Sequence, residues 1–453
     1  MSLPFEVGVD ATNARVFESR RAPQMLRVAT DTRTLQRGDT FLALRGDRFD
    51  GHDYIAQAIA AGAAALVVDR EDARVPGVAT LVVQDTLRAY MALAAAARAR
   101  YAGRVVGITG SVGKTTTKVL LEQLLARSVR VLASPANENN EIGVSRLLLS
   151  ASGKDLLIVE MGARKYGDIA ALVEIAKPDV GILTNVGEAH LEIMGSRQRI
   201  EETKWALFSR GALAVLNVFD DASRRRATEL SNRPQWFFAG AREPSDPPLP
   251  CCAIVGDDRL VLLRDEGRSE RALDVRLAGA HNRENLAAAL AGAIAVGAPL
   301  DALVDAVPSL HLPLGRFERV ALSGVDFIYD AYNASATGTL ASLDAFAQEP
   351  ATRRIAVLGG MLELGEESES LHERVGAHAA SCVQHLLAGG AFRHATARGA
   401  LSAGLCAERI VEYEANGEAA RWLREHVRPG DLVLLKGSRG YRLEEILAEL
   451  RGQ

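Results

Sequence analysis

Cysteine is scarce in this sequence, with four residues among 453. Cys251 and Cys252 are adjacent, whereas Cys382 and Cys406 stand far from them and from each other. This spacing predicts neither a disulfide framework nor a zinc site, because both are typically built from cysteines at short, recurring intervals. A reducing compartment fits such a chain, and we expect a cytoplasmic protein.

A strong net charge and a long apolar run are also lacking. The formal net charge is −4, which argues against nucleic acid as an obligate partner. No apolar run approaches the ~20 residues that span a membrane, and the first residues lack the basic-then-apolar layout of a signal peptide.

With 453 residues the chain is too long for one core and predicts about three domains. We expect a monomer that acts on small molecules.

The strongest functional signal is the segment 109–117. An apolar run at 104–108 predicts a buried strand, and leucines with helical spacing predict a helix over 117–125. The turn between them consists of Gly110, Ser111, Val112, Gly113, Lys114, Thr115 and Thr116. Glycines let the backbone approach a phosphate, the helix N-terminus faces the anion, and lysine adds a point charge. Because a threonine hydroxyl can hold Mg²⁺, the expected ligand is ATP or GTP with magnesium.

This phosphate loop is a short variant. The general pattern has a glycine five residues before Gly113, where this chain has Ile108. The first loop glycine is Gly110 instead. A glycine turn with a chance Lys-Thr pair is the alternative, but strand, turn, lysine, hydroxyls and helix all agree with a phosphate site.

Strand and helix patterns divide the chain into residues 1–102, 103–312 and 313–453. Predicted strands lie at 40–44, 64–68, 104–108, 156–159, 180–184, 212–216, 327–329, 354–358 and 432–435, predicted helices at 86–100 and 282–295, and a predicted hairpin at 253–263. Alternating strands and helices favour parallel sheets covered by helices. The predicted fold class is α/β, with a small N-terminal α/β domain, a central P-loop ATPase-like parallel sheet and a C-terminal Rossmann-like α/β domain.

Two central strands run into polar residues. Glu160 follows the strand at 156–159, and His190 follows the strand at 180–184. Ligands bind beyond the carboxyl ends of parallel strands, so both side chains are expected beside the phosphate loop, where they could hold Mg²⁺. The alternatives are a surface glutamate and a structural histidine. Lys204 lies further on in a predicted helix, where a lysine is usually a solvated charge.

Asparagines form a second group of candidates. Asn139 and Asn140 lie in a dense polar loop that could bind a substrate or cap a helix. Asn285 is one turn into the predicted helix at 282–295 and could present its amide to a nucleotide base.

The last part of the chain adds charged candidates. Arg316 follows the linker and could reach phosphates across a cleft, and Asp330 follows a strand end, where a carboxylate can bind ribose hydroxyls. Lys436, Ser438 and Arg439 follow the last predicted strand and form a candidate anion or carboxylate clamp.

Taken in order, these motifs resemble the Mur ligase family of peptidoglycan synthesis. The resemblance rests on the segments 109–116, 139–143, 160–162, 184–192, 281–285, 315–316 and 436–439. It spans nearly the whole chain, because 31–33, 38–41 and 50–52 resemble the family's uridine-nucleotide-binding domain and 358–365 resembles a C-terminal motif of one branch.

The resemblance implies an ATP-dependent, ADP-forming ligase that joins D-Ala-D-Ala to a UDP-N-acetylmuramoyl tripeptide through an acyl phosphate. Residues 1–102 would bind the UDP-linked substrate, 103–312 ATP, and 313–453 the incoming amine. The candidate substrate residues are Thr32, Arg33, Asn139, Asn140, Tyr332, Asn333, Lys436, Ser438 and Arg439.

It also implies individual roles. The catalytic residues would be Lys114, Lys204, His190 and Arg316, and the metal ligands of two Mg²⁺ sites would be Thr115, Glu160, His190 and Lys204. Lys204 would be carbamylated, because a carbamate oxygen suits Mg²⁺ as an ammonium cannot. Asn285 would meet the adenine, Arg316 the phosphates and Asp330 the ribose, after the C-terminal domain closes on the central one.

Departures from one branch of the family leave the substrates open. Ser335 and Ala336 stand where that branch has Asn-Pro, Gly360 where it has aspartate, and Ser145 where it commonly has proline. The alternatives are a paralogue that joins a different amine to another carboxylate, and a nucleotide-gated switch that does not ligate. The second alternative conflicts with the intact Glu160, His190 and Lys204.

Overall fold

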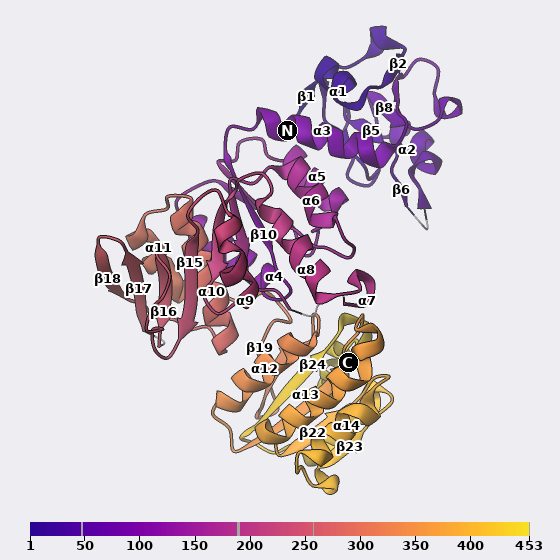
Figure 1. The fold of residues 1–453 in the computed structure, drawn as a ribbon. Coiled ribbons are helices and arrows are strands. Elements are labelled where there is room, and N and C mark those ends of the chain that lie inside the picture. The colour runs from indigo at the N-terminus through magenta and orange to yellow at the C-terminus, as the bar shows by residue number, and fades with distance from the viewer. Residues whose placement is uncertain (47–48, 188–190, 257, 453) are drawn as a thin grey trace.

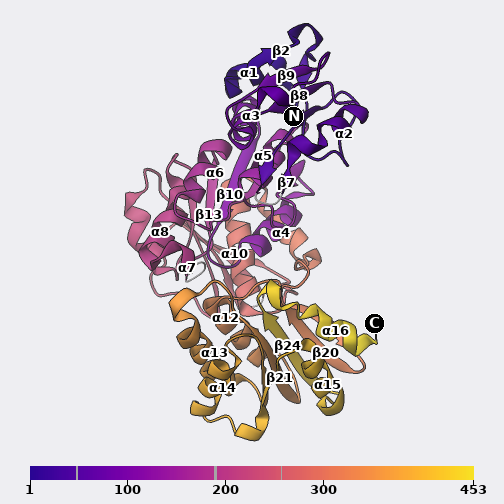
Figure 2. The same cartoon turned by 90° about the vertical axis from the view of Figure 1, so that its right-hand side faces the viewer.

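The computed structural model describes residues 1–46, 49–187, 191–256 and 258–452. Three α/β units follow one another along the chain, each with its own main sheet, and the central unit lies between the other two (Figures 1 and 2). This architecture confirms the predicted α/β fold with three domains. Within the described residues no helix has the length and apolar character needed to cross a membrane.

The N-terminal unit is built on a five-stranded sheet of order β2-β9-β8-β5-β4, in which only β2 is antiparallel to its neighbour. Its elements are β1 (Leu3–Pro4), α1 (Phe5–Thr12), β2 (Arg15–Phe17), β3 (Met25–Leu26), β4 (Val28–Ala29), β5 (Thr40–Leu42), β6 (Arg45–Gly46), β7 (Phe49–Asp50), α2 (Ile55–Ala60), β8 (Ala65–Val68), β9 (Ala79–Val82) and α3 (Thr86–Arg100). Helix α3 has the predicted bounds and is capped by Asp85, whose carboxylate accepts a hydrogen bond from the Arg88 backbone N–H at 2.7 Å. Leu93 and Ala97 of α3 are fully buried in a core that continues into the central unit.

The central unit is built on a nine-stranded sheet of order β11-β12-β10-β13-β14-β15-β16-β17-β18. Its strands are β10 (Arg104–Thr109), β11 (Val131–Ala133), β12 (Leu156–Glu160), β13 (Val180–Leu183), β14 (Leu213–Asn217), β15 (Gln235–Gly240), β16 (Cys251–Val255), β17 (Arg259–Arg264) and β18 (Gly267–Ala272). Its helices are α4 (Lys114–Leu125), α5 (Glu141–Leu149), α6 (Asp168–Ala176), α7 (Leu191–Met194), α8 (Arg197–Trp205), α9 (Asp221–Arg226), α10 (Ala280–Ala295) and α11 (Leu300–Ala306). The predicted hairpin is the antiparallel pair β16–β17, which continues this same sheet.

Strand register places the functional segments at one edge of the central sheet. Strand β10 is parallel to β12 and β13, with Ile108 opposite Glu160 and Thr109 opposite Leu183. The loops after these three strands therefore emerge together. Helices α4 and α10 pack on one face of the sheet, and α5 and α6 pack on the other.

The C-terminal unit is built on a six-stranded sheet of order β19-β20-β24-β21-β22-β23, in which only β19 is antiparallel to its neighbour. Its elements are β19 (Glu318–Leu322), β20 (Val325–Asp330), α12 (Ala336–Gln348), β21 (Arg353–Gly360), α13 (Ser368–Cys382), β22 (His385–Ala388), α14 (Arg393–Ser402), β23 (Ile410–Glu412), α15 (Asn416–His426), β24 (Asp431–Gly437) and α16 (Glu444–Arg451). Helices α12 and α13 belong to one core and α15 and α16 to another, so helices cover both faces, as in a Rossmann-like unit.

The C-terminal unit lies against the phosphate-loop edge of the central sheet. A Cβ atom added to Gly338, in the first turn of α12, would lie 3.3 Å from Cγ1 of Val112. One added to Gly187 would lie 3.3 Å from Oγ1 of Thr337. The start of α12 therefore packs directly on the loop that precedes α4.

Candidate active site

The phosphate loop depends on two glycines with positive φ. Gly110 has a φ of 153° and Gly113 a φ of 86°. A Cβ atom on Gly110 would lie 1.9 Å from Oγ1 of Thr184, and one on Gly113 would lie 2.3 Å from Oδ1 of Asn285. Because Gly113 turns the chain straight into the helix, α4 begins at Lys114, three residues before the predicted start at 117. Both glycines are therefore required by backbone conformation and by close packing.

The segment after β13 holds this loop in place. The side chain of Asn185 accepts a hydrogen bond from the Val112 N–H at 3.1 Å and donates one to the Val112 carbonyl at 3.2 Å. Thr184 donates to the same carbonyl at 2.6 Å, and the Ser111 hydroxyl accepts from the Gly187 N–H at 2.7 Å. The short loop is thus braced by a neighbouring strand end.

Lys114 and Lys204 meet at one carbonyl. Nζ of Lys114 donates to the Gly110 carbonyl at 2.7 Å, and Nζ of Lys204 donates to the same oxygen at 3.1 Å. Lys204 is 4% exposed, so the expectation of a solvated charge is wrong: α8 turns this side chain toward the loop. Burial and the nearby Lys114 lower the pKa of Lys204 well below its ordinary value, and burial also lowers the pKa of Lys114.

Glu160 lies beside the loop, as predicted, and is almost fully buried. Its Oε1 accepts hydrogen bonds from the Thr115 hydroxyl at 3.2 Å and from the Asn139 amide at 3.0 Å. Its Oε2 lies 3.0 Å from Nζ of Lys118, whose side chain is also buried and donates to the Ala136 carbonyl at 2.5 Å. Sequence reasoning missed Lys118, although it stands one helical turn after Lys114 and so shares its face of α4.

The donor set at this point fits magnesium. A threonine hydroxyl and a buried carboxylate, held 3.2 Å apart by a hydrogen bond, are the hard oxygen donors that Mg²⁺ prefers. Thr115 and Glu160 would hold the ion, and Asn139 and Lys118 would orient the carboxylate. Thr116 is buried in the same turn. His190 lies outside the described residues, so its metal role stays a prediction.

Arg316 reaches the loop from the linker to the C-terminal unit. One of its terminal nitrogens lies 3.5 Å from the Thr115 hydroxyl, and its guanidinium carbon lies 4.3 Å from the centre of the Tyr332 ring. Its Nε is buried without a hydrogen-bond partner in the described part of the chain. Burial lowers the pKa of Arg316. A buried guanidinium with an unused donor beside a phosphate loop is suited to bind an anion.

Asp330 and Lys436 form a buried ion pair in the C-terminal unit. Nζ of Lys436 lies 2.9 Å from Oδ2 of Asp330 and donates to the Asn333 carbonyl at 2.9 Å. Ser342 and the Phe317 backbone N–H also donate to this carboxylate. Burial raises the pKa of Asp330, but Lys436 and the hydrogen bonds outweigh it and hold that pKa below its usual range. Because Asp330 and Lys436 are paired with each other, neither is free in this structure to bind a ribose hydroxyl or an anion. Both roles stay predictions.

The three candidate asparagines have separate places. Asn139 binds Glu160, whereas Asn140 caps α5 by accepting the Gly143 N–H at 3.0 Å. Asn285 of α10 lies at the loop, where its Oδ1 accepts a hydrogen bond from the Thr117 hydroxyl at 3.4 Å. The sequence left two interpretations of the polar loop, a substrate site and a helix cap. Asn140 caps a helix, and Asn139 lies in the candidate site.

The other candidate substrate residues are spread over two units. In the N-terminal unit Thr32 donates to the Gln57 side chain at 3.0 Å, and Arg33 is exposed and pairs with Asp31 at 2.6 Å. In the C-terminal unit Ser438 is buried and accepts the Leu362 N–H at 3.0 Å.

Asn333 and Arg439 complete this set. Asn333 uses its side chain to accept the Ala334 N–H at 2.9 Å. Arg439 lies 3.8 Å from Glu444 with 66% of its side chain exposed. The structure therefore brings Arg316 and Tyr332 to the phosphate loop. Lys436 and Ser438 donate to the adjacent carbonyls of Asn333 and Ala334, and a clamp formed together with Arg439 stays a prediction.

The fold and this site define a class. A glycine loop between a central parallel strand and a helix, a buried carboxylate beside a hydroxyl, and an arginine from a following α/β unit are the parts of a nucleotide-binding protein that handles phosphoryl groups. Residues 27–101 match the catalytic domain of the Mur ligase family, 108–293 the Mur ligase middle domain, and 315–439 the glutamate ligase domain of Mur ligases. The chain belongs to the Mur ligase family.

Similar proteins agree over nearly the full length. The chain is 38% identical to a UDP-N-acetylmuramoyl-tripeptide–D-alanyl-D-alanine ligase of Synechocystis, over 93% of this chain and 91% of that protein. It is 33% identical to the Escherichia coli protein of the same name, over 94% and 93%. MurF from Acinetobacter baumannii superposes with a TM-score of 0.87 at 28% identity, covering 100% and 99% of the two chains. MurF from Thermotoga maritima, solved in complex with ADP, gives 0.79 at 30% identity, covering 94% and 96%.

Proposed function

We propose that this protein is an ATP-dependent ligase that adds D-Ala-D-Ala to a UDP-N-acetylmuramoyl tripeptide. The observation that carries the proposal is the contact of Arg316 with Thr115, which joins the C-terminal unit to a phosphate loop already lined by Lys114 and Lys204. Similar proteins of that name over more than nine-tenths of the chain support the choice of substrates. In this proposal residues 1–102 bind the UDP-linked tripeptide, 103–312 bind ATP, and 313–453 bind the dipeptide.

The reaction follows from the charges at the site. The tripeptide carboxylate attacks the γ-phosphorus of ATP, ADP leaves, and an acyl phosphate forms. The amine of D-Ala-D-Ala then adds to the acyl carbon, the amine proton is lost, and phosphate leaves as the amide bond forms. Lys114 and Arg316 neutralise the transferred phosphoryl group and hold it against the carboxylate, so catalysis rests mainly on positioning and charge. Mg²⁺ held by Thr115 and Glu160 would add further charge neutralisation.

Lys204 is proposed to carry a carbamate. Burial and the nearby Lys114 lower the pKa of Lys204 well below its usual value, which favours the neutral amine, and a neutral amine adds to CO₂ to give a carbamate anion and a proton. The anion would place a negative charge beside Lys114, which donates to the same Gly110 carbonyl as Lys204. It would also supply an oxygen ligand for a second Mg²⁺, together with His190.

Two variants test the carbamate. Lys204→Ala is expected to lower kcat about 10²- to 10³-fold, and added short-chain carboxylic acids should restore part of the activity because they replace the carbamate oxygen. Lys204→Arg keeps a cation but cannot form a carbamate, so it should be equally impaired and should not respond to those acids. Full activity of the unsupplemented alanine variant, or of the arginine variant, contradicts the proposal.

The departures from the family pattern motivate the paralogue alternative. Ser335 nevertheless caps α12, because its hydroxyl accepts the Gly338 N–H at 3.3 Å, and Ala336 is the first residue of that helix. Gly360 has a φ of 99°, a conformation that glycine adopts without strain. Ser335 thus still caps the helix, as an asparagine there would, and Gly360 fits the backbone conformation at its position.

A substrate panel separates the alternatives. ADP and phosphate release is measured with UDP-linked and free carboxylates, each combined with amino acids and dipeptides. The proposal expects turnover only when the muramoyl tripeptide and D-Ala-D-Ala are both present. Turnover with a different pair identifies a paralogue, and hydrolysis that no acceptor or amine changes identifies a nucleotide switch.

Cellular location and assembly are part of the proposal. The four cysteines are free thiols in the structure, which is consistent with a reducing cytoplasm. A monomer is expected, and light scattering of the full chain should then give a mass near 48.5 kDa. A mass of twice that value contradicts this part.

A further inference from the structure

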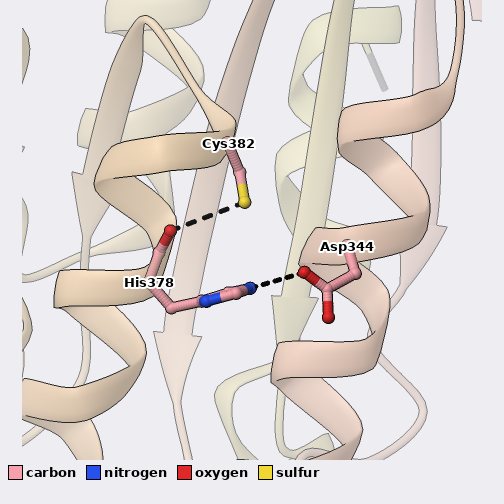
Figure 3. Close-up of side chains that lie close together, drawn as sticks. All are labelled: Asp344, His378 and Cys382. Atoms are coloured by element: carbon pink, nitrogen blue, oxygen red, sulfur yellow. Dashed lines mark hydrogen bonds and ion pairs between the residues drawn. The ribbon is translucent and has the colours of Figure 1, made fainter.

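A histidine, a cysteine and an aspartate meet between two helices of the C-terminal unit. His378 and Cys382 stand one turn apart on α13, and Asp344 faces them from α12 (Figure 3). Their ligand atoms all lie within 4.8 Å of one another. Because the two elements are separated along the chain, this cluster is invisible in the sequence, where cysteine spacing suggested no metal site.

The cluster is held in place and is still open to solvent. Nε2 of His378 lies 2.7 Å from Oδ1 of Asp344, and Sγ of Cys382 donates to the His378 carbonyl at 3.5 Å. Leu343 and Ala379, neighbours of these residues on the two helices, are fully buried in a common core, which sets the distance between the helices. The side chains of His378 and Asp344 are 34% and 58% exposed, so an ion can reach them.

The cluster lies away from the candidate active site. Gln384, two residues after Cys382, donates its backbone N–H to the Arg354 carbonyl at the start of β21. Asp330 ends β20 and Lys436 lies near the end of β24, at the opposite edge of the same parallel sheet. None of the hydrogen bonds that these three side chains make in the described part of the chain involves a residue of the candidate active site.

We propose that Asp344, His378 and Cys382 bind one divalent transition-metal ion of the zinc type. One sulfur, one imidazole nitrogen and one carboxylate oxygen form a donor set that zinc accepts and that magnesium does not, because Mg²⁺ prefers oxygen. Around a tetrahedral zinc such atoms lie about 3.3 to 3.6 Å apart, as follows from bond lengths of about 2.0 to 2.3 Å. The ligand atoms that lie up to 4.8 Å apart must then approach by about 1 Å, and the Nε2–Oδ1 pair at 2.7 Å must open by about 0.6 Å. Side-chain rotation can supply both movements, and water completes the fourth position.

Binding involves a defined proton balance. The Cys382 thiol loses its proton to solvent as the metal–sulfur bond forms, because the thiolate is the ligand. The proton on Nε2 of His378, now shared with Asp344, moves to Nδ1, which leaves Nε2 free as a ligand. One proton is released for each ion bound, and the ion then links α12 to α13.

The test uses the full chain stripped of metal with a chelator and titrated with Zn²⁺ alone by calorimetry, and with Co²⁺ by absorption spectroscopy. We expect one ion per chain, release of one proton, and a sulfur-to-cobalt charge-transfer band. Cys382→Ser should abolish that band, and His378→Gln should weaken Zn²⁺ binding at least about tenfold. Cys406→Ser removes an exposed cysteine of the same unit and should change neither quantity.

Contrary results are equally clear. Absence of a charge-transfer band in the unmodified chain, its persistence in Cys382→Ser, or its loss in Cys406→Ser would each overturn the site. If Cys382→Ser fails to fold by circular dichroism, Asp344→Asn at an exposed position provides the second variant. It should bind Zn²⁺ more weakly and keep the band, and unchanged affinity would remove Asp344 from the proposal.

Discussion

The phosphate loop and the C-terminal sheet both bury lysines, but their charges are balanced differently. At the loop Lys114 and Lys204 donate to one neutral carbonyl, that of Gly110. In the C-terminal unit Lys436 lies against the carboxylate of Asp330. In the described part of the chain Lys114 forms no direct ion pair, although Glu160 lies near enough to raise its pKa, whereas Asp330 directly offsets the charge of Lys436. The loop is therefore ready for an anionic ligand, and the Asp330–Lys436 pair stabilises its own unit.

Lys436→Met tests the Asp330–Lys436 ion pair and should have the largest effect. It leaves the Asp330 carboxylate buried without its cation, which costs about 3 to 5 kcal/mol of unfolding free energy. Urea denaturation at pH 7 measures the loss. The double variant Asp330→Asn/Lys436→Met removes both charges and should recover much of it, so an equally unstable double variant contradicts the ion-pair explanation.

The same pair predicts a change in pH dependence. In the native chain the folded pKa of Asp330 is lowered, so its contribution to stability is present above about pH 4 and is lost as pH falls through the folded pKa. In Lys436→Met burial dominates and raises that pKa above the unfolded value. The deficit of the variant should therefore shrink between pH 7 and pH 5, and a deficit that grows would show the opposite sign.

Lys114→Ala tests the lysine at the phosphate loop. Removing a charge placed for the transferred phosphoryl group should lower kcat/KM about 10²- to 10³-fold. The free energy of unfolding should not fall, because a buried cation that forms no direct ion pair with any described residue contributes little to stability. Lys154→Ala, in the turn before β12 and outside the site, is the matched control and should keep normal activity.

Lys118→Met sharpens the comparison, because Lys118 is the lysine at the loop that does face a carboxylate, that of Glu160. The variant should lose about 2 to 3 kcal/mol of stability, since Thr115 and Asn139 still donate to Glu160. Mg²⁺ with ATP should raise the Tm of the variant more than that of the native chain, because the ion replaces the missing positive charge. Equal shifts would contradict a metal site at Glu160.

Ser335→Ala has the smallest expected effect. Loss of the cap on α12 should cost about 1 kcal/mol in urea denaturation. Ser335→Asn inserts the residue found in the related branch, also a good cap, and should be neutral in both stability and choice of amine. A changed amine preference in Ser335→Asn would favour the paralogue alternative.

Much of the backbone was predictable from the sequence. The predicted central strands overlap β10, β12, β13 and β14 to within about two residues, and α3 has the predicted bounds. Their apolar runs and turn residues are local signals, and local signals decide strand and helix type. The placement of Glu160 beside the loop also followed, because parallel strands end at a common edge.

Side-chain pairing was not predictable in the same way. Lys204 is buried although its helix has few apolar residues, and Lys118 was passed over as an ordinary helix residue. Strands β22 and β23 were missed because they are short, spanning only His385–Ala388 and Ile410–Glu412. In each case the deciding contact comes from another element of the fold.

By itself the sequence determined the succession of strands and helices and the glycine loop, because backbone conformation follows from short-range sterics and periodicity. Only the tertiary structure decided which buried charges are paired with an opposite charge and which are not. Lys204 and Gly110 are 94 residues apart, and Lys436 and Asn333 are 103 apart. Coulomb energy depends on distance in space and on burial, and no local pattern contains either quantity.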